Sequence, residues 1–188
     1  MSDMSTAKKR SQFVVRELRN QAELQACSAL DHSFHTEQVW QMDVRDDGDD
    51  MAVRFRLVRL PRTMQVCYPR DSEKLLQLWE QRDCFLVAVA DDVVLGYVNM
   101  HLDTVNEKGW IRDLVVGAPF RRRRLGSALL EQAARWASLR ATRHLTLEMQ
   151  TKNYPGIQFA HKHGFVFCGF NDRYYTNQDI AIFYGKTL

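Results

Sequence analysis

Residues 114–130 read LVVGAPFRRRRLGSALL, and this stretch decides the fold. Its first three residues are apolar and predict a buried strand, Pro119 marks a turn, and the apolar spacing from Leu125 predicts an amphipathic helix over about residues 125–139. The first backbone N–H groups of a helix have no partner within it, and the helix dipole makes that end positive. The stretch therefore predicts a turn that binds a phosphate group.

An arginine run, Arg121, Arg122, Arg123 and Arg124, stands at the expected start of this helix. Cationic side chains oppose the dipole at that end, so these arginines argue for an anionic partner. Guanidinium groups donate charge-assisted hydrogen bonds to phosphate, and Gly126 permits close approach of a ligand. The stretch has neither the P-loop pattern GxxxxGK[ST] nor the dinucleotide pattern GxGxxG, which excludes those two kinds of phosphate site.

Length and composition predict one globular domain. The chain has 188 residues, of which 45% are hydrophobic and 26% charged, with 9 Gly and 4 Pro, which excludes disordered and fibrous classes. We expect residues 1–11 to form a flexible N-terminal tail and residues 12–188 to form a single domain. The formal net charge of +3 is too small to support a nucleic-acid partner, although the arginine run alone would fit one.

Targeting and cysteine patterns predict a soluble, cytoplasmic protein. No run of 18 apolar residues is present, and no apolar segment follows the basic N-terminal residues, so we expect neither a membrane span nor a secretory signal. Cys84 and Cys168 stand in apolar runs, where we expect buried thiols in a reducing compartment. Together with Cys27 and Cys67 they form no CxxC or Cys/His pattern, so we expect no metal ion.

The order of expected elements predicts a mixed α/β domain, with antiparallel strands first and one strand–helix–strand crossover later. A hairpin is expected where an acidic link at residues 46–50 separates two alternating runs. The expected strands are residues 13–18, 39–44, 51–58, 84–90, 93–102, 110–116, 144–149, 165–170 and 179–185, and the expected helices are residues 22–30, 71–82, 125–139 and 155–163.

Two motifs resemble the GCN5-related N-acetyltransferase (GNAT) superfamily. Residues 121–126, RRRRLG, resemble its acetyl-coenzyme A motif [R/Q]-x-x-G-x-[G/A], with Arg124 in place of the first glycine. Residues 153–165 resemble the family segment N-x-x-A-x-x-F-Y-x-K-x-G-F, with Gly156 in place of alanine and Ala160 in place of tyrosine. The residues that match this segment are Asn153, Phe159, Lys162, Gly164 and Phe165.

The resemblance implies a GNAT-like α/β fold, with a central, mostly antiparallel sheet that is flanked by helices and whose fourth and fifth strands splay apart. It also implies acetyl-coenzyme A (acetyl-CoA) as the cosubstrate, with its pantetheine arm along residues 114–116 and its pyrophosphate on residues 121–127. A backbone N–H of Val115 or Val116 would face the thioester oxygen. The implied cofactor-binding residues are Leu114, Val115, Val116, Arg121, Arg122, Arg123, Arg124, Leu125, Gly126, Ser127 and Asn153.

The activity that the resemblance implies is transfer of the acetyl group to a primary amine of a small molecule or peptide by direct attack. An ammonium acceptor must first lose a proton, and Glu148, on an otherwise apolar strand beside the splay, is the expected general base. A strand-end carboxylate paired with Lys or Arg is the structural alternative for Glu148. The family tyrosine that protonates the thiolate is Ala160 here, so the acid stays open among water, Tyr154, His161, His163, Tyr174 and Tyr175.

The amine acceptor is the expected partner, and a homodimer is also open. Residues 148–174 faintly resemble streptothricin-type antibiotic acetyltransferases and also enzymes that modify ribosomal-protein N termini. The resemblance implies an acceptor groove lined by residues 34–44 and 173–179, and the aspartates near residues 43–50 would attract a cationic acceptor if their hairpin leans over it. Ala160 and Arg124 suggest an alternative function, a non-catalytic sensor domain that binds acyl-CoA.

Overall fold

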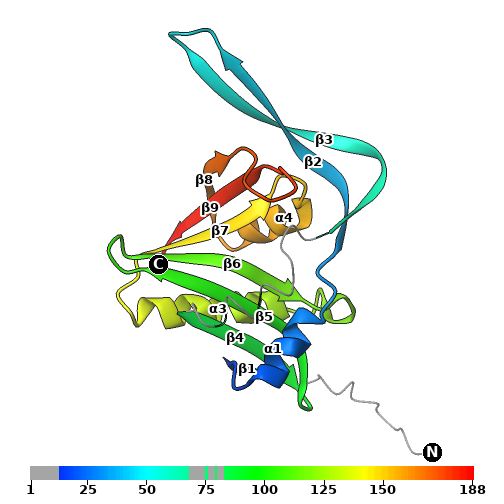
Figure 1. The fold of residues 1–188 in the computed structure, drawn as a ribbon, viewed down its shortest axis with the longest axis vertical. Helices are drawn as coiled ribbons and strands as arrows, with labels where there is room; N and C mark the ends of the chain where they lie inside the picture. The colour runs from blue at the N-terminus through cyan, green and yellow to red at the C-terminus, as the bar shows by residue number, and fades with distance from the viewer. Residues whose placement is uncertain (1–12, 68–74, 76–78, 80–82) are drawn as a thin grey trace, which may run out of the picture.

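The structure is a computed structural model that describes residues 13–67, 75, 79 and 83–188. In this part of the chain, seven strands form one sheet and two further strands form a separate hairpin (Figure 1). The expected tail of residues 1–11 and most of the expected helix of residues 71–82 lie outside the described residues. Within that segment Leu75 and Trp79 are helical and pack in the hydrophobic core.

The main sheet is mixed and mostly antiparallel, as predicted. Its strand order is β1-β4-β5-β6-β7-β9-β8; β6 and β7 pair in parallel, whereas the other five neighbouring pairs are antiparallel. The parallel pair requires a crossover connection, which helix α3 provides between β6 and β7. The strands are β1 Val14–Glu17, β4 Cys84–Ala90, β5 Val93–Asp103, β6 Lys108–Val116, β7 His144–Gln150, β8 Val166–Asn171 and β9 Ala181–Thr187.

Helices cover both faces of the main sheet. Leu129 of α3 packs with Leu86 of β4 in one core cluster, and Leu24 of α1 packs with Val87 in the other. Because neighbouring residues of a strand point to opposite faces, α3 and α1 lie on opposite faces, which explains why β4 is apolar along its whole length. The helices are α1 Gln21–Ser28, α3 Leu125–Ser138 and α4 Tyr154–Lys162, and a 3-10 turn, η1, spans Ala118–Phe120.

Strands β6 and β7 separate after four paired residues, which is the splay that was predicted. The last pair is Ile111 with Leu147, whereas β6 stays paired with β5 as far as Val116. A bulge in the β5–β6 ladder accompanies the separation, because Ile111 and Asp113 lie opposite consecutive residues of β5. The C-terminal half of β6 therefore borders a gap on its β7 side.

Strands β2 (Phe34–Asp46) and β3 (Met51–Val66) form a long antiparallel hairpin, which we call the arm. The predicted hairpin and its acidic turn are confirmed, but both strands are longer than predicted. Phe55 of the arm contacts Phe167 and Phe170 of β8, with ring centroids 5.6 and 5.5 Å apart. These contacts join the arm to the edge of the main sheet, while its turn projects beyond the sheet (Figure 1).

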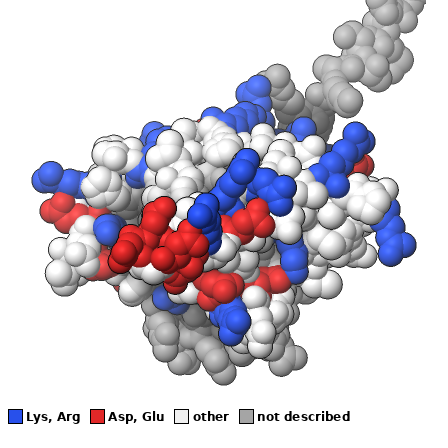
Figure 2. Space-filling model, turned by 90° about the horizontal axis from the view of Figure 1, so that it is seen from above, with Lys and Arg blue, Asp and Glu red and all other residues white. Residues whose placement is uncertain are grey.

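The acidic turn of the arm is partly neutralised by arginines of the arm itself. Arg56 Nε donates to Asp43 Oδ2 at 3.0 Å, and Arg45 forms an ion pair with Asp47. Figure 2, a view from the end of the arm, shows acidic and basic side chains next to each other on this face. Because the turn projects beyond the sheet, the structure does not support the expectation that these aspartates attract the acceptor.

The four cysteines are free thiols. Cys27 and Cys84 are buried, and burial raises the pKa of each thiol to about 12. The prediction that Cys168 is buried is wrong: it is exposed, because β8 is the edge strand of the sheet. Among the described residues, no helix is both long and apolar enough to cross a membrane.

Candidate active site

The turn between β6 and α3 has the backbone shape of an anion-binding turn. Arg122 and Arg124 adopt the left-handed conformation, with φ of 64° and 68°. Arg124 is the N-cap of α3, and its side chain makes no capping hydrogen bond. The first N–H groups of α3 therefore have no intrahelical partner and are available to an anion. Glycine adopts left-handed angles without strain, which explains why the motif that the sequence resembles has glycine at position 124.

The arginines of this turn fall into two groups. Arg121 Nε donates to the carbonyl of Val116 and its Nη2 donates to the carbonyl of Asp31, both at 2.8 Å. Arg121 thus closes the turn and joins it to the end of α1. Arg122, Arg123 and Arg124 are exposed, and no hydrogen bond or ion pair to another described residue holds their guanidinium groups.

Helix α4 packs closely against the start of α3. A Cβ atom at Gly126 would lie 3.4 Å from the Phe159 ring, at van der Waals contact. Ser127 Oγ lies 2.9 Å from His163 Nε2 at the end of α4. Burial and the nearby Lys162 lower the pKa of His163, which makes its ring neutral at neutral pH. The first turn of α3, with Leu125 buried, is thereby fixed against α4.

Asn153 is the N-cap of α4. Its Oδ1 accepts a hydrogen bond from the backbone N–H of Gly156 at 2.9 Å. A Cβ atom at position 156 would lie 2.7 to 2.8 Å from the side-chain amide of Asn153, which is too close. Glycine in place of the alanine of the motif therefore makes room for this capping side chain.

The backbone of β6 borders the gap toward β7 at alternate residues. Gly117 N–H donates to the Leu95 carbonyl at 2.9 Å, so Gly117 faces β5. Alternation along the strand then directs the backbone groups of Val115 toward β5 and those of Leu114 and Val116 toward the gap. The side chain of Val115 is buried in the core on the α1 side of the sheet.

Glu148 is 8% exposed and stands on β7 one residue beyond the last pair with β6. Two side chains donate to its Oε2: Trp110 Nε1 of β6 at 2.8 Å and Tyr174 Oη of the β8–β9 loop at 2.9 Å. Both of these donors are neutral groups. They hold the carboxylate beside the point where β6 and β7 separate.

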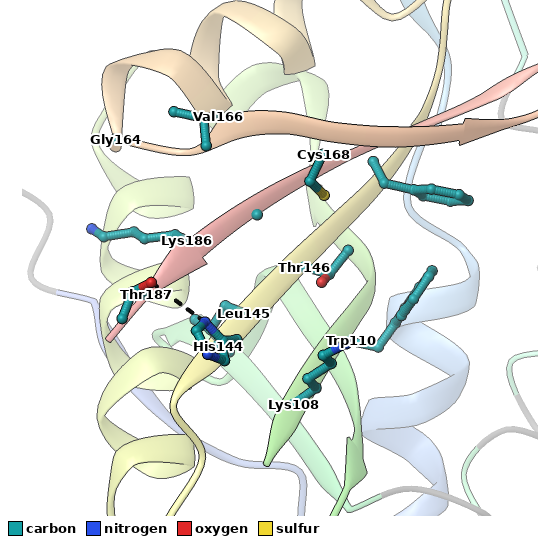
Figure 3. Close-up of a pocket in the computed structure, with 12 residues that line it drawn as sticks. Lys108, Trp110, His144, Leu145, Thr146, Gly164, Val166, Cys168, Lys186 and Thr187 are labelled. Atoms are coloured by element: carbon teal, nitrogen blue, oxygen red, sulfur yellow. Dashed lines mark hydrogen bonds between the residues drawn. The ribbon is translucent and has the colours of Figure 1, made fainter. Parts of the chain in front are cut away.

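A groove of about 500 Å³ lies across β6, β7, β9 and β8 (Figure 3), and Trp110, which donates to Glu148, is one of its lining residues. Its lining includes Trp110 and Phe183, whose ring centroids lie 5.2 Å apart. The ring centroid of Tyr174 lies 5.8 Å from that of Phe183. Lys108 and Lys186 also line the groove. Among the described residues, no group of three or more His, Cys, Asp or Glu side chains is placed to hold a metal ion.

The side chains that are candidates for the acid that protonates the thiolate lie in different surroundings. Ala160 is fully buried and carries no proton donor. Tyr174 is the candidate that bonds to Glu148, whereas His163 bonds to Ser127 and His161 packs against Tyr184. Tyr175 is buried, and Tyr154 is the first residue of α4.

Trp110 is the site residue that sequence reasoning missed. It stands on a predicted strand, where an aromatic residue is ordinary. Its one distinguishing signal is an indole N–H, which needs a hydrogen-bond partner when it is partly buried. Nothing in the sequence says that this partner is Glu148, which lies 38 residues further along the chain.

Comparison with known proteins agrees with this geometry. The Acetyltransferase (GNAT) family matches residues 54–165. Streptothricin acetyltransferase from Streptomyces lavendulae is 30% identical over 158 residues, which cover 80% of this chain and 80% of that protein. The family match extends over the β6–α3 turn, β7 and α4.

Solved structures show the same fold. The crystal structure of nourseothricin acetyltransferase has a TM-score of 0.78 and 24% identity, covering 93% of this chain and 98% of that one. A protein from Bacillus anthracis strain Ames, assigned as a streptothricin acetyltransferase and solved with acetyl-CoA, has a TM-score of 0.73 and 20% identity, covering 94% and 100%. The chain therefore belongs to the acetyltransferase (GNAT) family, which confirms the predicted fold, the N-acetyltransferase activity and acetyl-CoA as the cosubstrate.

Proposed function

We propose that this enzyme acetylates a primary amine of a streptothricin-type antibiotic, with Glu148 as the general base. The observation that carries the proposal is the Glu148 carboxylate, held by Trp110 and Tyr174 beside the gap between β6 and β7. The 30% identity with the Streptomyces lavendulae streptothricin acetyltransferase supports this acceptor over a peptide.

In the proposed reaction Glu148 takes a proton from the acceptor ammonium, directly or through water. The free amine then attacks the thioester carbonyl of acetyl-CoA. The tetrahedral intermediate loses the second amine proton to water and collapses to the amide and the coenzyme A thiolate. We assign the thioester oxygen to a backbone N–H of β6 that faces the gap. Of the two residues expected from the sequence, Val115 faces β5, which leaves Val116, and Leu114 is the other residue that faces the gap. Ala160 provides no acid, but a thiol with a pKa of about 8.5 leaves readily as the anion.

The cofactor-binding assignment follows the same arrangement. The N-terminus of α3 would receive the pyrophosphate, with the guanidinium groups of Arg122, Arg123 and Arg124 as charge-assisted donors. The gap-facing backbone of Val116 would bind the pantetheine arm, and Asn153 would bind it from α4. Arg121, whose side chain bonds to two backbone carbonyls, supports this site by closing the turn.

The proposal is tested by incubating the purified enzyme with acetyl-CoA and either streptothricin or peptides with free N termini. We expect steady release of free coenzyme A and an acetylated antibiotic by mass spectrometry. Glu148→Gln should lower kcat by a factor on the order of 10² to 10⁴ and leave the Kd of acetyl-CoA within about twofold. Glu107→Gln is the control, since Glu107 is exposed and pairs with Arg143.

Three outcomes would contradict parts of the proposal. Acetylated peptides with unmodified streptothricin would overturn the acceptor. Full turnover by Glu148→Gln would overturn the base. Acetyl-CoA binding without release of coenzyme A, for every amine, would favour the sensor alternative suggested by Ala160.

We also propose a cytoplasmic location. The free thiols of all four cysteines suit a reducing compartment. The homodimer stays a prediction, which light scattering after size-exclusion chromatography would test.

A further inference from the structure

Asp179 joins the β8–β9 loop to the strand that carries Glu148. Its Oδ2 accepts hydrogen bonds from Gln150 Nε2 at 2.6 Å and from Asn177 Nδ2 at 3.0 Å, and its Oδ1 forms an ion pair with Lys152. Gln150 is the last residue of β7, and Lys152 follows it in the turn before α4. One carboxylate thus receives donors from the end of β7 and from its own loop.

The backbone around Asp179 folds the loop tightly about Tyr175. Tyr175 N–H donates to the Asp179 carbonyl at 3.3 Å, and Gln178 N–H donates to the Tyr175 carbonyl at 2.7 Å. Asp179 N–H donates in turn to Asn177 Oδ1 at 3.1 Å. Tyr175 is buried, and its ring centroid lies 5.1 Å from that of Tyr174. The Asp179 end of the loop is therefore linked to Tyr174 through Tyr175.

Burial makes this arrangement depend strongly on the Asp179 charge. The Asp179 side chain is 13% exposed, and Gln150 is 2% exposed. A carboxylate that is largely removed from water is stable only when donors replace its hydration, and Asp179 has two amide donors and one ammonium. Removing the carboxylate would also leave the buried Gln150 amide without this acceptor.

Glu148 and Gln150 are two residues apart on β7, so their side chains leave the same face of the sheet. The loop returns to that face: Asp179 is held by Gln150, and Tyr174 Oη reaches Glu148 Oε2 at 2.9 Å. Two successive side chains on this face of β7 thus contact the two ends of one loop. A displacement of the Asp179 end would shift the Tyr174 end against the carboxylate.

We propose that Asp179 is the positioning residue of the Glu148 site: it clamps the β8–β9 loop to β7 and so holds the Tyr174 hydroxyl on the Glu148 carboxylate. This inference rests on the proposed role of Glu148 as the base. Asp179 acts through Tyr174 and touches neither acetyl-CoA nor the acceptor in the proposed reaction.

The test is a double-mutant cycle with Tyr174→Phe and Asp179→Ala, read as kcat and KM with streptothricin. We expect each single change to lower kcat/KM by a factor on the order of 10 to 100, because a small misplacement of a catalytic group has that effect. Because Asp179 works through Tyr174, adding Tyr174→Phe to Asp179→Ala should cause less than a further twofold loss. The Kd of acetyl-CoA, measured by calorimetry, should stay within about twofold in all variants.

Two further variants keep the test interpretable. Asp172→Ala is the matched control, since Asp172 lies in the same loop and is exposed, and its one ion pair among the described residues is a 4.0 Å contact with Arg173. Asp179→Asn keeps an acceptor oxygen while losing the charge, so it carries the cycle if Asp179→Ala does not fold. We expect the kcat/KM of Asp179→Asn to lie between that of the wild type and that of Asp179→Ala.

Amide hydrogen exchange without substrate tests the clamp separately from catalysis. Asp179→Ala should speed exchange of residues 173–178, and Asp172→Ala should not. Unchanged exchange in Asp179→Ala, or fully multiplicative losses in the cycle, would overturn the positioning role. If Glu148→Gln keeps full turnover while Asp179→Ala still speeds exchange of residues 173–178, the proposed role of Glu148 is contradicted. The contact of Asp179 with the loop is then still supported.

Discussion

Trp110 donates its indole N–H to Glu148 across the last paired stretch of β6 and β7, with 2.8 Å between Nε1 and Oε2. The donor lies one residue before the final β6–β7 pair and the acceptor one residue after it, on opposite strands. The hydrogen bond thus crosses the point where the strands separate. It ties the carboxylate to the strand whose backbone borders the gap.

Replacing Trp110 with Phe tests this bond, because Phe keeps a ring against Phe183 and removes the donor. We expect kcat to fall on the order of 10- to 100-fold, since a hydrogen bond to a charged group contributes about 1.5–3 kcal/mol. Steady-state kinetics with a thiol reagent for released coenzyme A measure the effect. Trp136→Phe is the control, because Trp136 Nε1 bonds to the exposed Glu17 at 3.1 Å, and equal losses in both variants would contradict a specific role.

Arg124→Gly should stabilise the folded protein. A non-glycine residue in the left-handed region costs about 1–2 kcal/mol, which exceeds the roughly 0.4–1 kcal/mol by which glycine favours the unfolded chain. Urea denaturation should therefore give a free energy of unfolding at or above that of the wild type, and Arg124→Ala should fall below Arg124→Gly. A less stable Arg124→Gly protein would contradict a strained backbone at this N-cap.

Asn153 and Gly156 should behave as a coupled pair in stability measurements. Asn153→Ala removes the cap of α4 and should cost about 1 kcal/mol. Gly156→Ala should also destabilise, because the new Cβ would lie 2.7 Å from the Asn153 amide and would displace it from its capping position. The double variant should lose less free energy of unfolding than the two single variants lose together. Without the Asn153 side chain the new Cβ has nothing to clash with, and Ala favours a helix by about 1 kcal/mol over Gly. Strict additivity in urea denaturation would refute the coupling.

His163 should make stability depend on pH in the mildly acidic range. Its pKa is lowered in the folded protein by burial and by Lys162, so the unfolded chain binds the proton more tightly. The stabilisation from the neutral ring is therefore complete above the ordinary pKa of about 6.5 and is lost as pH falls through the lowered pKa. The melting temperature should drop more steeply on acidification in the wild type than in His163→Gln. Parallel curves for the two proteins would contradict this linkage.

Much of the local structure around the β6–α3 turn and α4 was predictable because its signals are local. Helix α3 was expected at residues 125–139 and spans Leu125–Ser138, since apolar spacing and the preceding Pro119 are properties of one short stretch. The capping role of Asn153 follows equally from its neighbours. The left-handed angle at Arg124 is visible only indirectly, through the glycine that the resembling motif has there.

The remainder depends on contacts between distant parts of the chain. The hydrogen bonds of Glu148 join it to Trp110 and Tyr174, and no pattern in a single sequence reports such partners. The second strand of the arm is longer than predicted because it continues past Pro61, a residue that usually ends a strand. Proline is tolerated there because the ladder is interrupted: Arg59 pairs with Gln38 and Met64 with Thr36, and the residues of β3 between them are not paired in the ladder.

The gap between β6 and β7 is bordered by peptide groups, and peptide groups are the same whatever the side chains are. Apolar substitutions at positions 114 and 116 would change side chains only. The backbone N–H and C=O groups that face the gap would stay the same. Evolution is then free to remodel the loops that meet the other substrate, while the thioester partner is kept. A change of acceptor on this scaffold would therefore leave the proposed acyl-donor strand as it is.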